Sequence, residues 1–440
     1  MDSIQGLTRG PAVPTAKLGV PLWWDQAPPV RTPELPWPID VDVLVVGSGY
    51  TGLSAALTLA RNGRSVLVCD AGAIGEGAST RNGAHVGAKL RPSLAQLTAR
   101  YGEDRAMALW REALAARKYI GELIEREGIK CDFLECGRFL GAYKEADFDY
   151  LIGSAEVLNA KLGYPFTAVP RKDQPKVIDT DAYFGGVIDH TTAAFHPGKF
   201  VAEVARLVMR EGGRIASHTR VMTIERERSG FRSGTEKGSV TARNVILATN
   251  GYTGPEFRHF QRRIIPIGSY IIATQELSEE FVDRLLPGCR LVADTRRCAS
   301  YMRVSPDGRR IVYGGRVAAA EISPDASGPR LKAVLDRIFP QLRGTAITHS
   351  WMGFTGFTFD DVPHIGIHDG IHYAMGYCGT SGTSLGPYLG HKIALKVLQA
   401  ADAETAFDGL QFETRSWYRG NPWFLSTAVA YYRLRDWLRI

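Results

Sequence analysis

Short apolar runs alternate along this chain with glycine-rich turns and with stretches of helical spacing. Residues 43–46 are all apolar and mostly β-branched, which is typical of a strand buried on both faces. Residues 53–60 then have the pattern of a buried helix, and residues 65–69 form a second apolar run. A strand, a helix and a second strand in this order predict a parallel sheet of the Rossmann type.

The turn between the first strand and the helix carries a dinucleotide-binding pattern. Gly47, Gly49 and Gly52 match G-x-G-x-x-G, and Asp70 ends the second strand eighteen residues later. The first glycine permits a tight turn, the second lets backbone N–H groups approach a diphosphate, and the third lets helix and strand pack closely. The aspartate can accept both hydroxyls of an adenosine ribose. We therefore predict a dinucleotide-binding fold.

Three further segments favour FAD over NAD. Residues 75–83 follow the second strand at once, and their small residues, hydroxyls, arginine and amide suit a loop against a second phosphate and a flavin ring, or simply a polar loop with an Asn-Gly turn. Residues 238–251 read as a strand that ends in a small-residue turn. The glycine-rich turn 376–384 precedes a helix whose N-terminus suits the flavin pyrimidine. The residues predicted to bind the cofactor are Gly47, Ser48, Gly49, Tyr50, Thr51, Gly52, Asp70, Ala71, Ser79, Thr80, Arg81, Asn82, Gly83, Val221, Ala248, Thr249, Gly379, Thr380, Ser381, Gly382 and Thr383.

The remaining pattern predicts an α/β chain, α+β overall, in which a Rossmann-type FAD-binding domain is interleaved with a smaller, antiparallel-sheet substrate domain. The N-terminal arm is rich in proline and tryptophan, and its tryptophans indicate that it packs on the body. The expected divisions are the arm 1–40, the FAD-binding segments 41–131, 193–261 and 350–410, the substrate segments 132–192 and 262–349, and a C-terminal tail helix 411–440.

Composition narrows the class of protein. The chain is 45% hydrophobic and 22% charged, which is ordinary for a soluble globular protein. Six scattered cysteines without accompanying histidines indicate neither a metal site nor a disulfide framework, so we expect a reducing cytoplasm. The net charge of +7 is dispersed, so we expect no nucleic-acid partner. We expect no signal peptide and no membrane span, and we favour packing of the aromatic tail 417–440 on the body or a second subunit over an interfacial membrane helix.

The motifs resemble those of the D-amino-acid oxidase superfamily of FAD-dependent oxidoreductases, which includes glycine and sarcosine oxidases. The resemblance runs through residues 42–56, 77–83 and 248–251 and continues to residues 351–366 and 376–382. The Gly-Tyr-Thr-Gly and Ser-x-Arg-Asn-Gly combinations look nearest to γ-glutamylputrescine oxidase-like members. The resemblance implies non-covalent FAD, because the histidine that carries the flavin in some relatives falls at Asn82.

One departure from the family pattern bears on the substrate. The glycine-oxidase-like motif W-x-G-x-R-P-x-T-x-D-x-x-P is kept at Trp351, Gly353 and Asp360, but Thr355 stands where the arginine clamps the substrate α-carboxylate. A threonine cannot form a bidentate pair with a carboxylate. An amine without an α-carboxylate is therefore the expected substrate. Arg316 or Arg303 can hold a more distant carboxylate, although a surface ion pair is the favoured interpretation of each.

Four other residues are candidates for the substrate side. His85 falls where the resemblance puts the loop near the isoalloxazine, or is a hydrogen-bonded structural histidine. Tyr270 and Tyr301 either wall the amine pocket or belong to an aromatic core. Lys89 is a candidate cation for oxygen activation near flavin N5, against the alternative of a solvent-facing lysine.

The sequence thus predicts FAD-dependent oxidation of a primary or secondary amine, γ-glutamylputrescine-like or N-alkyl, to an imine by hydride transfer to flavin N5, followed by hydrolysis. Oxygen is the expected electron acceptor, and no oligomeric state is predicted. Two alternatives stay open: a 2-hydroxy-acid or amino-acid dehydrogenase, and a non-catalytic flavoprotein subunit.

Overall fold

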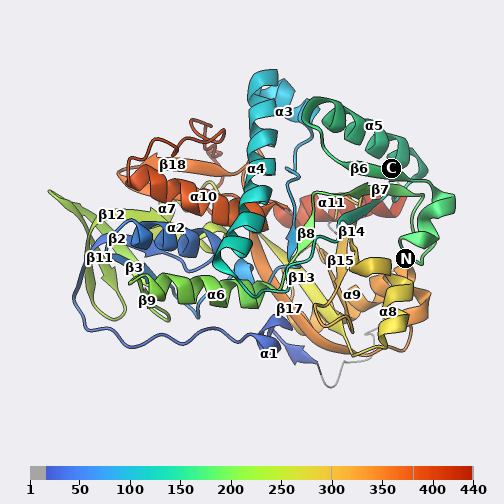
Figure 1. Ribbon diagram of the computed structural model, residues 1–440, viewed down its shortest axis with the longest axis horizontal. Helices are drawn as coiled ribbons and strands as arrows, with labels where there is room; N and C mark the ends of the chain where they lie inside the picture. The colour runs from blue at the N-terminus through green and yellow to red at the C-terminus, as the bar shows by residue number, and fades with distance from the viewer. Residues whose placement is uncertain (1–15, 299, 380, 439–440) are drawn as a thin grey trace.

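The computed structural model describes residues 16–298, 300–379 and 381–438, which form two large mixed β-sheets with helices packed on them (Figure 1). A small two-stranded sheet pairs β4 (His85–Val86) with β8 (Ala193–Ala194). The sheet that contains β2 (Ile39–Val46), the strand before the glycine motif, lies at the left of Figure 1, and the second sheet lies at the right, with α4 (Glu103–Glu127) standing between them. The α/β prediction is confirmed.

The first sheet has eight strands, and its centre is parallel. Strands β9, β3, β2, β12 and β19 are neighbours in this order, and β10, β11 and β18 extend the sheet through antiparallel pairs. The strand bounds are β2 Ile39–Val46, β3 Val66–Cys69, β9 Arg214–Ala216, β10 Val221–Glu227, β11 Gly230–Thr235, β12 Ser239–Leu247, β18 His364–His368 and β19 Ile371–Met375.

Both faces of this sheet are covered, as the apolar run in β2 predicts. Val43 and Val45 belong to the cluster under the helices, whereas Leu44 and Val46 belong to a second cluster on the opposite face, which contains Phe231 of β11. Successive residues of a strand point to opposite faces, so an unbroken apolar run requires a cover on each. Helices of the first cluster are α2 Tyr50–Arg61, α3 Leu94–Tyr101, α4, α6 Pro197–Arg210 and α10 Gly382–Val397.

The second sheet has nine strands in the order β1-β17-β13-β16-β15-β14-β5-β7-β6. Most of its pairs are antiparallel, but β1–β17 and β14–β5 are parallel. Helices α5 Glu145–Leu162, α8 Glu279–Leu285 and α9 Pro324–Ile338 pack on it. The strand bounds are β1 Lys17–Leu18, β5 Arg138–Gly141, β6 Phe166–Val169, β7 Gly186–Asp189, β13 Ile265–Thr274, β14 Leu291–Asp294, β15 Ser300–Val304, β16 Ile311–Gly315 and β17 Ile347–Phe357.

One expected domain boundary is wrong. The division between 349 and 350 falls inside β17, which pairs with β13 from Ile347 to Phe357 and so belongs to the nine-stranded sheet over its whole length. The motif that begins at Trp351 therefore starts in the middle of a strand and does not mark a boundary between the two sheets. The return to the eight-stranded sheet comes later, at β18.

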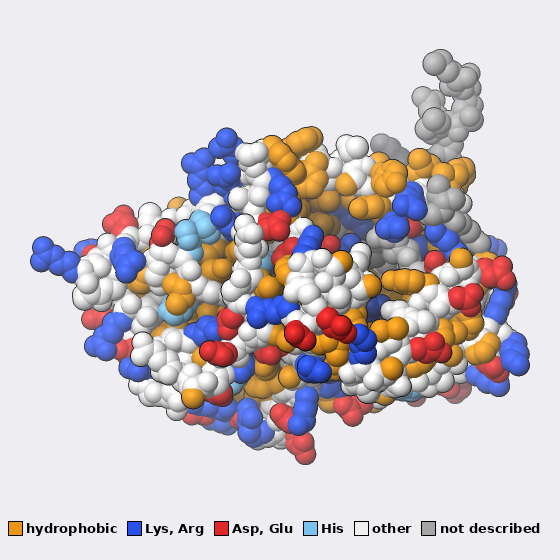
Figure 2. All heavy atoms as spheres, turned by 90° about the horizontal axis from the view of Figure 1, so that it is seen from above, with side chains coloured by type: hydrophobic (Ala, Val, Ile, Leu, Met, Phe, Trp, Pro, Cys, Tyr) orange, Lys and Arg blue, Asp and Glu red, His pale blue; other side chains and the backbone are white. Residues whose placement is uncertain are grey.

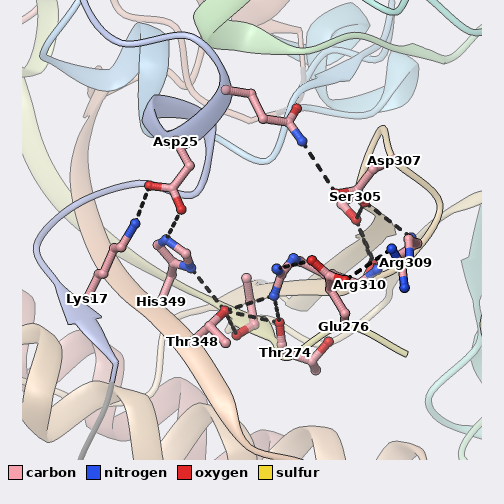
Figure 3. Close-up of polar contacts among 12 residues, drawn as sticks. Lys17, Asp25, Thr274, Glu276, Ser305, Asp307, Arg309, Arg310, Thr348 and His349 are labelled. Carbon is pink, nitrogen blue, oxygen red and sulfur yellow. Dashed lines mark hydrogen bonds and ion pairs between the residues drawn. The ribbon is translucent and has the colours of Figure 1, made fainter. Parts of the chain in front are cut away.

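The described part of the N-terminal arm packs on the body, as its tryptophans predict. Helix α1 (Trp23–Gln26) buries Trp23 edge-on against Trp351. Figure 3 shows the polar side of this contact, where Asp25 accepts hydrogen bonds from Lys17 and from His349 of β17. The same network continues from His349 through Thr348 to the Arg310–Glu276 pair, so the arm is tied to the edge of the nine-stranded sheet (Figure 3).

The surface mixes charges of both signs. On the face drawn in Figure 2, Lys and Arg side chains are interspersed with Asp and Glu. No helix of the described residues is long and apolar enough to cross a membrane. The last helix, α11 (Leu425–Leu438), ends the described chain.

Candidate cofactor and substrate site

A cavity of about 580 Å³ lies between the two sheets. The carboxyl ends of β2, β3 and β12 contribute Val46, Cys69 and Ala248 to its wall, and β17 contributes Met352 and Thr355. Open parallel sheets bind ligands at the carboxyl ends of their strands. The cavity is therefore where the glycine motif predicts a dinucleotide.

Close packing around the glycine turn aims α2 at this cavity. Gly47 has φ +104°, and a Cβ there would lie 2.8 Å from the carbonyl oxygen of Ala248. A Cβ on Gly52 would lie 1.8 Å from the carbonyl oxygen of Gly47, so only glycine fits between helix and turn. Gly49 and Tyr50, at the helix N-terminus, line the cavity. The positive end of the helix dipole suits a diphosphate there.

Asp70 presents a half-buried carboxylate to the cavity. One oxygen accepts the backbone N–H of Ser48 at 2.7 Å and its hydroxyl at 2.6 Å, and the other accepts the N–H of Gly72 at 2.9 Å. Burial raises the pKa of Asp70, while these hydrogen bonds act to lower it. Carboxylate oxygens keep further lone pairs for hydroxyl donors, which a ribose supplies.

The loop 75–83 is held against the helix by its own polar side chains. The hydroxyl of Ser79 accepts the N–H of Tyr50 at 2.9 Å, so its proton is left to donate into the cavity. The amide of Asn82 donates to the Tyr50 hydroxyl at 3.1 Å and accepts the N–H of Ala84. Arg81 directs its guanidinium to the carbonyls of Glu76 and Gly19 at 2.7 and 2.8 Å. It therefore ties the loop to the arm.

Fifteen of the residues predicted to bind the cofactor line the cavity, namely Gly47, Gly49, Tyr50, Thr51, Asp70, Ala71, Ser79, Arg81, Asn82, Val221, Ala248, Thr249, Gly379, Gly382 and Thr383. Others support the wall from behind: Ser48 holds Asp70, Gly52 seats α2, and the hydroxyl of Thr80 donates to the carbonyl of Gly75. Gly83 packs on Tyr301, and Ser381 precedes the first turn of α10. Thr380 lies outside the described residues.

Several lining residues carry no signal in the sequence. Tyr252 accepts the N–H of Phe354 at 3.1 Å and packs edge-on against its ring, which joins the turn after β12 to β17. Arg220 forms a 3.5 Å ion pair with Glu256 beside Val221. Asn250 follows the recognised Ala-Thr turn, has φ +42° and accepts the N–H of Gly376. For Asn250, the Asn-Gly sequence indicates the left-handed backbone and nothing about the contact with Gly376.

Of the six residues predicted to act on the substrate, all within the described chain, Thr355 alone lines this cavity. His85 and Tyr301 lie one layer behind. Their rings pack edge-on at 5.7 Å, and the hydroxyl of Thr383, which does line the cavity, donates to the carbonyl of His85. Burial lowers the pKa of His85 well below its usual value, so its ring is neutral. The Tyr301 hydroxyl shares a 2.8 Å hydrogen bond with Ser269.

Arg316 and Tyr270 belong to another cluster. Arg316 is buried and pairs with Glu321 at 2.7 Å, and the hydroxyl of Tyr270 donates to the same carboxylate. Arg316 also donates to the carbonyl of Gly268. The expected ion pair is present, and it joins the buried guanidinium of Arg316 to a carboxylate, Glu321, that is exposed at the surface. For Arg303 that interpretation is wrong, because Arg303 is buried and donates to the carbonyls of Phe195 and Val304.

Lys89 is neither a free surface lysine nor a lining residue of the cavity. Burial lowers the pKa of its ammonium to about 8, and nearby Arg138 lowers it further while Asp189 acts in the opposite direction. Arg138 and Asp189 are themselves a buried pair at 3.0 Å.

Comparison with known proteins identifies the family. A sequence profile described as DAO, FAD dependent oxidoreductase, matches residues 42–395. The chain belongs to this family. It is 32% identical to gamma-glutamylputrescine oxidoreductase of Escherichia coli (strain K12), over 91% of this chain and 94% of that protein. It is 30% identical to the probable oxidoreductase OrdL of Rhizobium meliloti (strain 1021), over 94% and 97%. The fold matches glycine oxidase from Geobacillus kaustophilus with a TM-score of 0.71 at 21% identity, covering 86% of this chain and 99% of that one.

The DAO-family assignment confirms the resemblance seen in the motifs, and proteins of this family bind FAD. The cavity fits that group in two respects. Its glycine turn leaves no room for a Cβ at Gly47 or Gly52, which brings the N-terminus of α2 to the cavity wall, and Asp70 offers a carboxylate beside the turn. The first residues of α10, Gly382 and Thr383, bring a second helix N-terminus to the same cavity.

Replacing Asp70 with asparagine is expected to weaken FAD binding about ten- to hundredfold. An amide keeps the size of the carboxylate but turns an NH2 group toward the donors on Ser48 or Gly72, and it removes charged hydrogen bonds of about 1.5–3 kcal/mol. Fluorescence titration of the apoprotein with FAD measures the change. Asp40→Asn, at an exposed position of β2, is the matched control, and equal affinities of the two variants would contradict the role of Asp70.

Proposed function

We propose that this DAO-family enzyme oxidises a primary or secondary amine without an α-carboxylate, γ-glutamylputrescine-like or N-alkyl, to an imine that water hydrolyses. The 32% identity to gamma-glutamylputrescine oxidoreductase over nearly the whole chain supports this class of substrate. Bound FAD supplies the hydride acceptor. The protein has to hold the amine beside it, neutral and correctly turned, and to exclude water.

The observation that carries the proposal is that the positively charged side chains around the cavity already have partners within the protein. The described residues that line the cavity include two arginines, Arg81 and Arg220, and no lysine. Arg81 donates to backbone carbonyls of the loop and the arm, and Arg220 pairs with Glu256. At the position of the family's carboxylate clamp stands Thr355. A small α-amino acid therefore meets no free guanidinium in this wall.

The residues around Thr355 suit an uncharged amine. A threonine hydroxyl can accept from or donate to nitrogen, and the neutral ring of His85, which lies behind Thr383 of the same cavity, adds no positive charge. The Tyr252 and Phe354 rings offer apolar surface for the carbon chain. An uncharged environment of this kind favours the deprotonated amine, which is the form that loses a hydride.

We further propose that FAD is held without a covalent bond. Asn82 stands where some relatives carry a flavin-bound histidine, and its amide is used to hold Tyr50 and the backbone of the loop. The six cysteines are free thiols, three of them buried (Cys69, Cys131 and Cys378), which supports a reducing, cytoplasmic setting.

An anaerobic substrate panel tests the proposal directly. We expect the holoenzyme to lose its flavin absorbance when mixed with N-alkyl amines or γ-glutamyl diamines, and to keep it with 2-hydroxy acids. The readout is the absorbance near the long-wavelength flavin band in a stopped-flow instrument. Bleaching by hydroxy acids alone would select the dehydrogenase alternative, and bleaching by neither class would select a non-catalytic flavoprotein subunit.

Thr355→Arg is expected to shift specificity toward small amino acids. The native enzyme should oxidise glycine, sarcosine and D-alanine tens- to thousands-fold less efficiently than its best amine, because a charged hydrogen-bonded anchor is worth about 2–5 kcal/mol. The arginine should narrow that gap in kcat/KM. Thr355→Gln adds similar bulk without charge and serves as the control. If the native enzyme oxidises glycine as efficiently as any amine, another group binds the carboxylate.

The pH dependence of flavin reoxidation by oxygen tests whether Lys89 assists that step. With a pKa of about 8, its ammonium is charged below pH 8 and neutral above it. If that charge favours electron transfer to oxygen, the reoxidation rate should fall as the pH rises through 8, and Lys89→Met should be slow at every pH. Stopped-flow mixing of reduced enzyme with oxygen measures both. Lys118→Met, at an exposed site on α4, is the control, and an unchanged profile in Lys89→Met would remove Lys89 from this role.

A further inference from the structure

Helix α11 presents an apolar stripe to solvent. The stripe consists of Tyr431, Leu434, Trp437 and Leu438, whose exposed fractions are 56%, 52%, 76% and 47%. At 3.6 residues per turn, these positions fall within about one third of the helix circumference. Exposed apolar side chains scattered singly are ordinary, but four on one face of one helix indicate an interaction surface.

The opposite side of α11 fixes the helix on the body. Leu425 and Val429 are buried. The carboxylate of Asp436 accepts the N–H groups of Arg297 and Cys298 at 3.0 and 2.9 Å, in the turn between β14 and β15. The guanidinium of Arg297 lies 6.0 Å from the ring centroid of Tyr432. The stripe faces outward because the other face of the helix contacts the body of the protein.

Two arginines flank the stripe, one on each side. By helical position, Arg433 follows Trp437 around the helix and Arg435 follows Tyr431, and the guanidinium of Arg435 lies 5.9 Å from the Tyr431 ring centroid. Asp436 is the only acidic residue of α11, and its charge points inward to backbone donors. The exposed face of the helix is thus apolar and aromatic at its centre and positive at its borders.

We propose that α11 docks on a membrane surface that carries anionic lipids. Tryptophan and tyrosine favour the boundary between headgroups and acyl chains, and arginines beside them reach the phosphates. Fourteen residues make a helix of about 21 Å, which is shorter than a bilayer core, so the helix lies along the surface. The positive borders fit anionic headgroups by charge complementarity, which an apolar protein groove would not require. A second copy of this chain would bring the arginines of one stripe against those of the other.

Vesicle flotation with the full-length holoenzyme tests this surface. We expect the protein to float with vesicles of phosphatidylcholine and phosphatidylglycerol and to stay in solution with phosphatidylcholine alone. Added salt should weaken the binding because the arginine contribution is screened. The readout does not involve amine oxidation, so it stands or fails separately from the proposed activity.

Two variants separate the apolar and the charged contributions. Leu434→Ser with Trp437→Ser should lower the vesicle partition coefficient at least about tenfold, since each side chain loses a favourable transfer from water. Arg433→Gln with Arg435→Gln should lower it about tenfold or more on anionic vesicles. Tyr150→Ser, which removes a side chain exposed to 63% on α5, is the matched control and should bind as the native protein does.

The proposal is overturned if the native protein does not float with anionic vesicles, or if Tyr150→Ser lowers binding as much as the stripe variants. Light scattering compares the oligomeric state of the native protein with that of the stripe variant. If the native protein is a dimer that the Leu434→Ser, Trp437→Ser variant dissociates, the occupant of the stripe is a second copy. Because the changed side chains are exposed, apart from the half-buried Arg435, all variants should unfold close to the temperature of the native protein, which calorimetry checks.

Discussion

The approach of α2 to the end of β2 is the constraint on which the cofactor cavity depends. Gly52 rests on the carbonyl of Gly47, and on the other side of α2 a Cβ at Gly390 of α10 would lie 2.3 Å from the carbonyl of Thr51. Glycines on both sides thus pin α2 between the turn and α10. A single methyl group at either contact would lift the helix, and its N-terminal N–H groups would no longer face the cavity.

The loop that follows β3 fixes the position of the second sheet relative to that cavity. The indole of Trp351 in β17 donates to the carbonyl of Arg81, and the indole of Trp23 in the arm donates to the carbonyl of Asn82, both at 3.0 Å. Both carbonyls belong to the loop whose side chains contact α2. Substrate strand, arm and cofactor loop are therefore one connected unit, and the position of Thr355 relative to the glycine turn follows from it.

The glycine turn, Asp70 and the buried strands could be predicted because each depends on local chemistry: a left-handed backbone, a terminal carboxylate, an unbroken apolar run. Tyr252, Arg220 and the pairing of Arg316 with Glu321 could not, because they depend on which distant segments meet. The boundary within β17 was missed for a similar reason, since strand pairing continues through residues whose motif belongs to the cofactor site. For α11 the helical pattern was visible, but which face the body covers was not.

The charges around the cavity support the proposed preference for an amine over an amino acid. The N-termini of two helices, α2 and α10, line the cavity, and their dipoles favour an anionic cofactor, so guanidinium groups are not needed there. Arg81 and Arg220 instead hold the loop, the arm and Glu256 in place. At the proposed substrate position the wall offers Thr355 and the rings of Tyr252 and Phe354, and neutral His85 lies behind Thr383 of the same cavity. A carboxylate brought to this wall would lose its hydration without gaining a cation, whereas an uncharged amine gives up little.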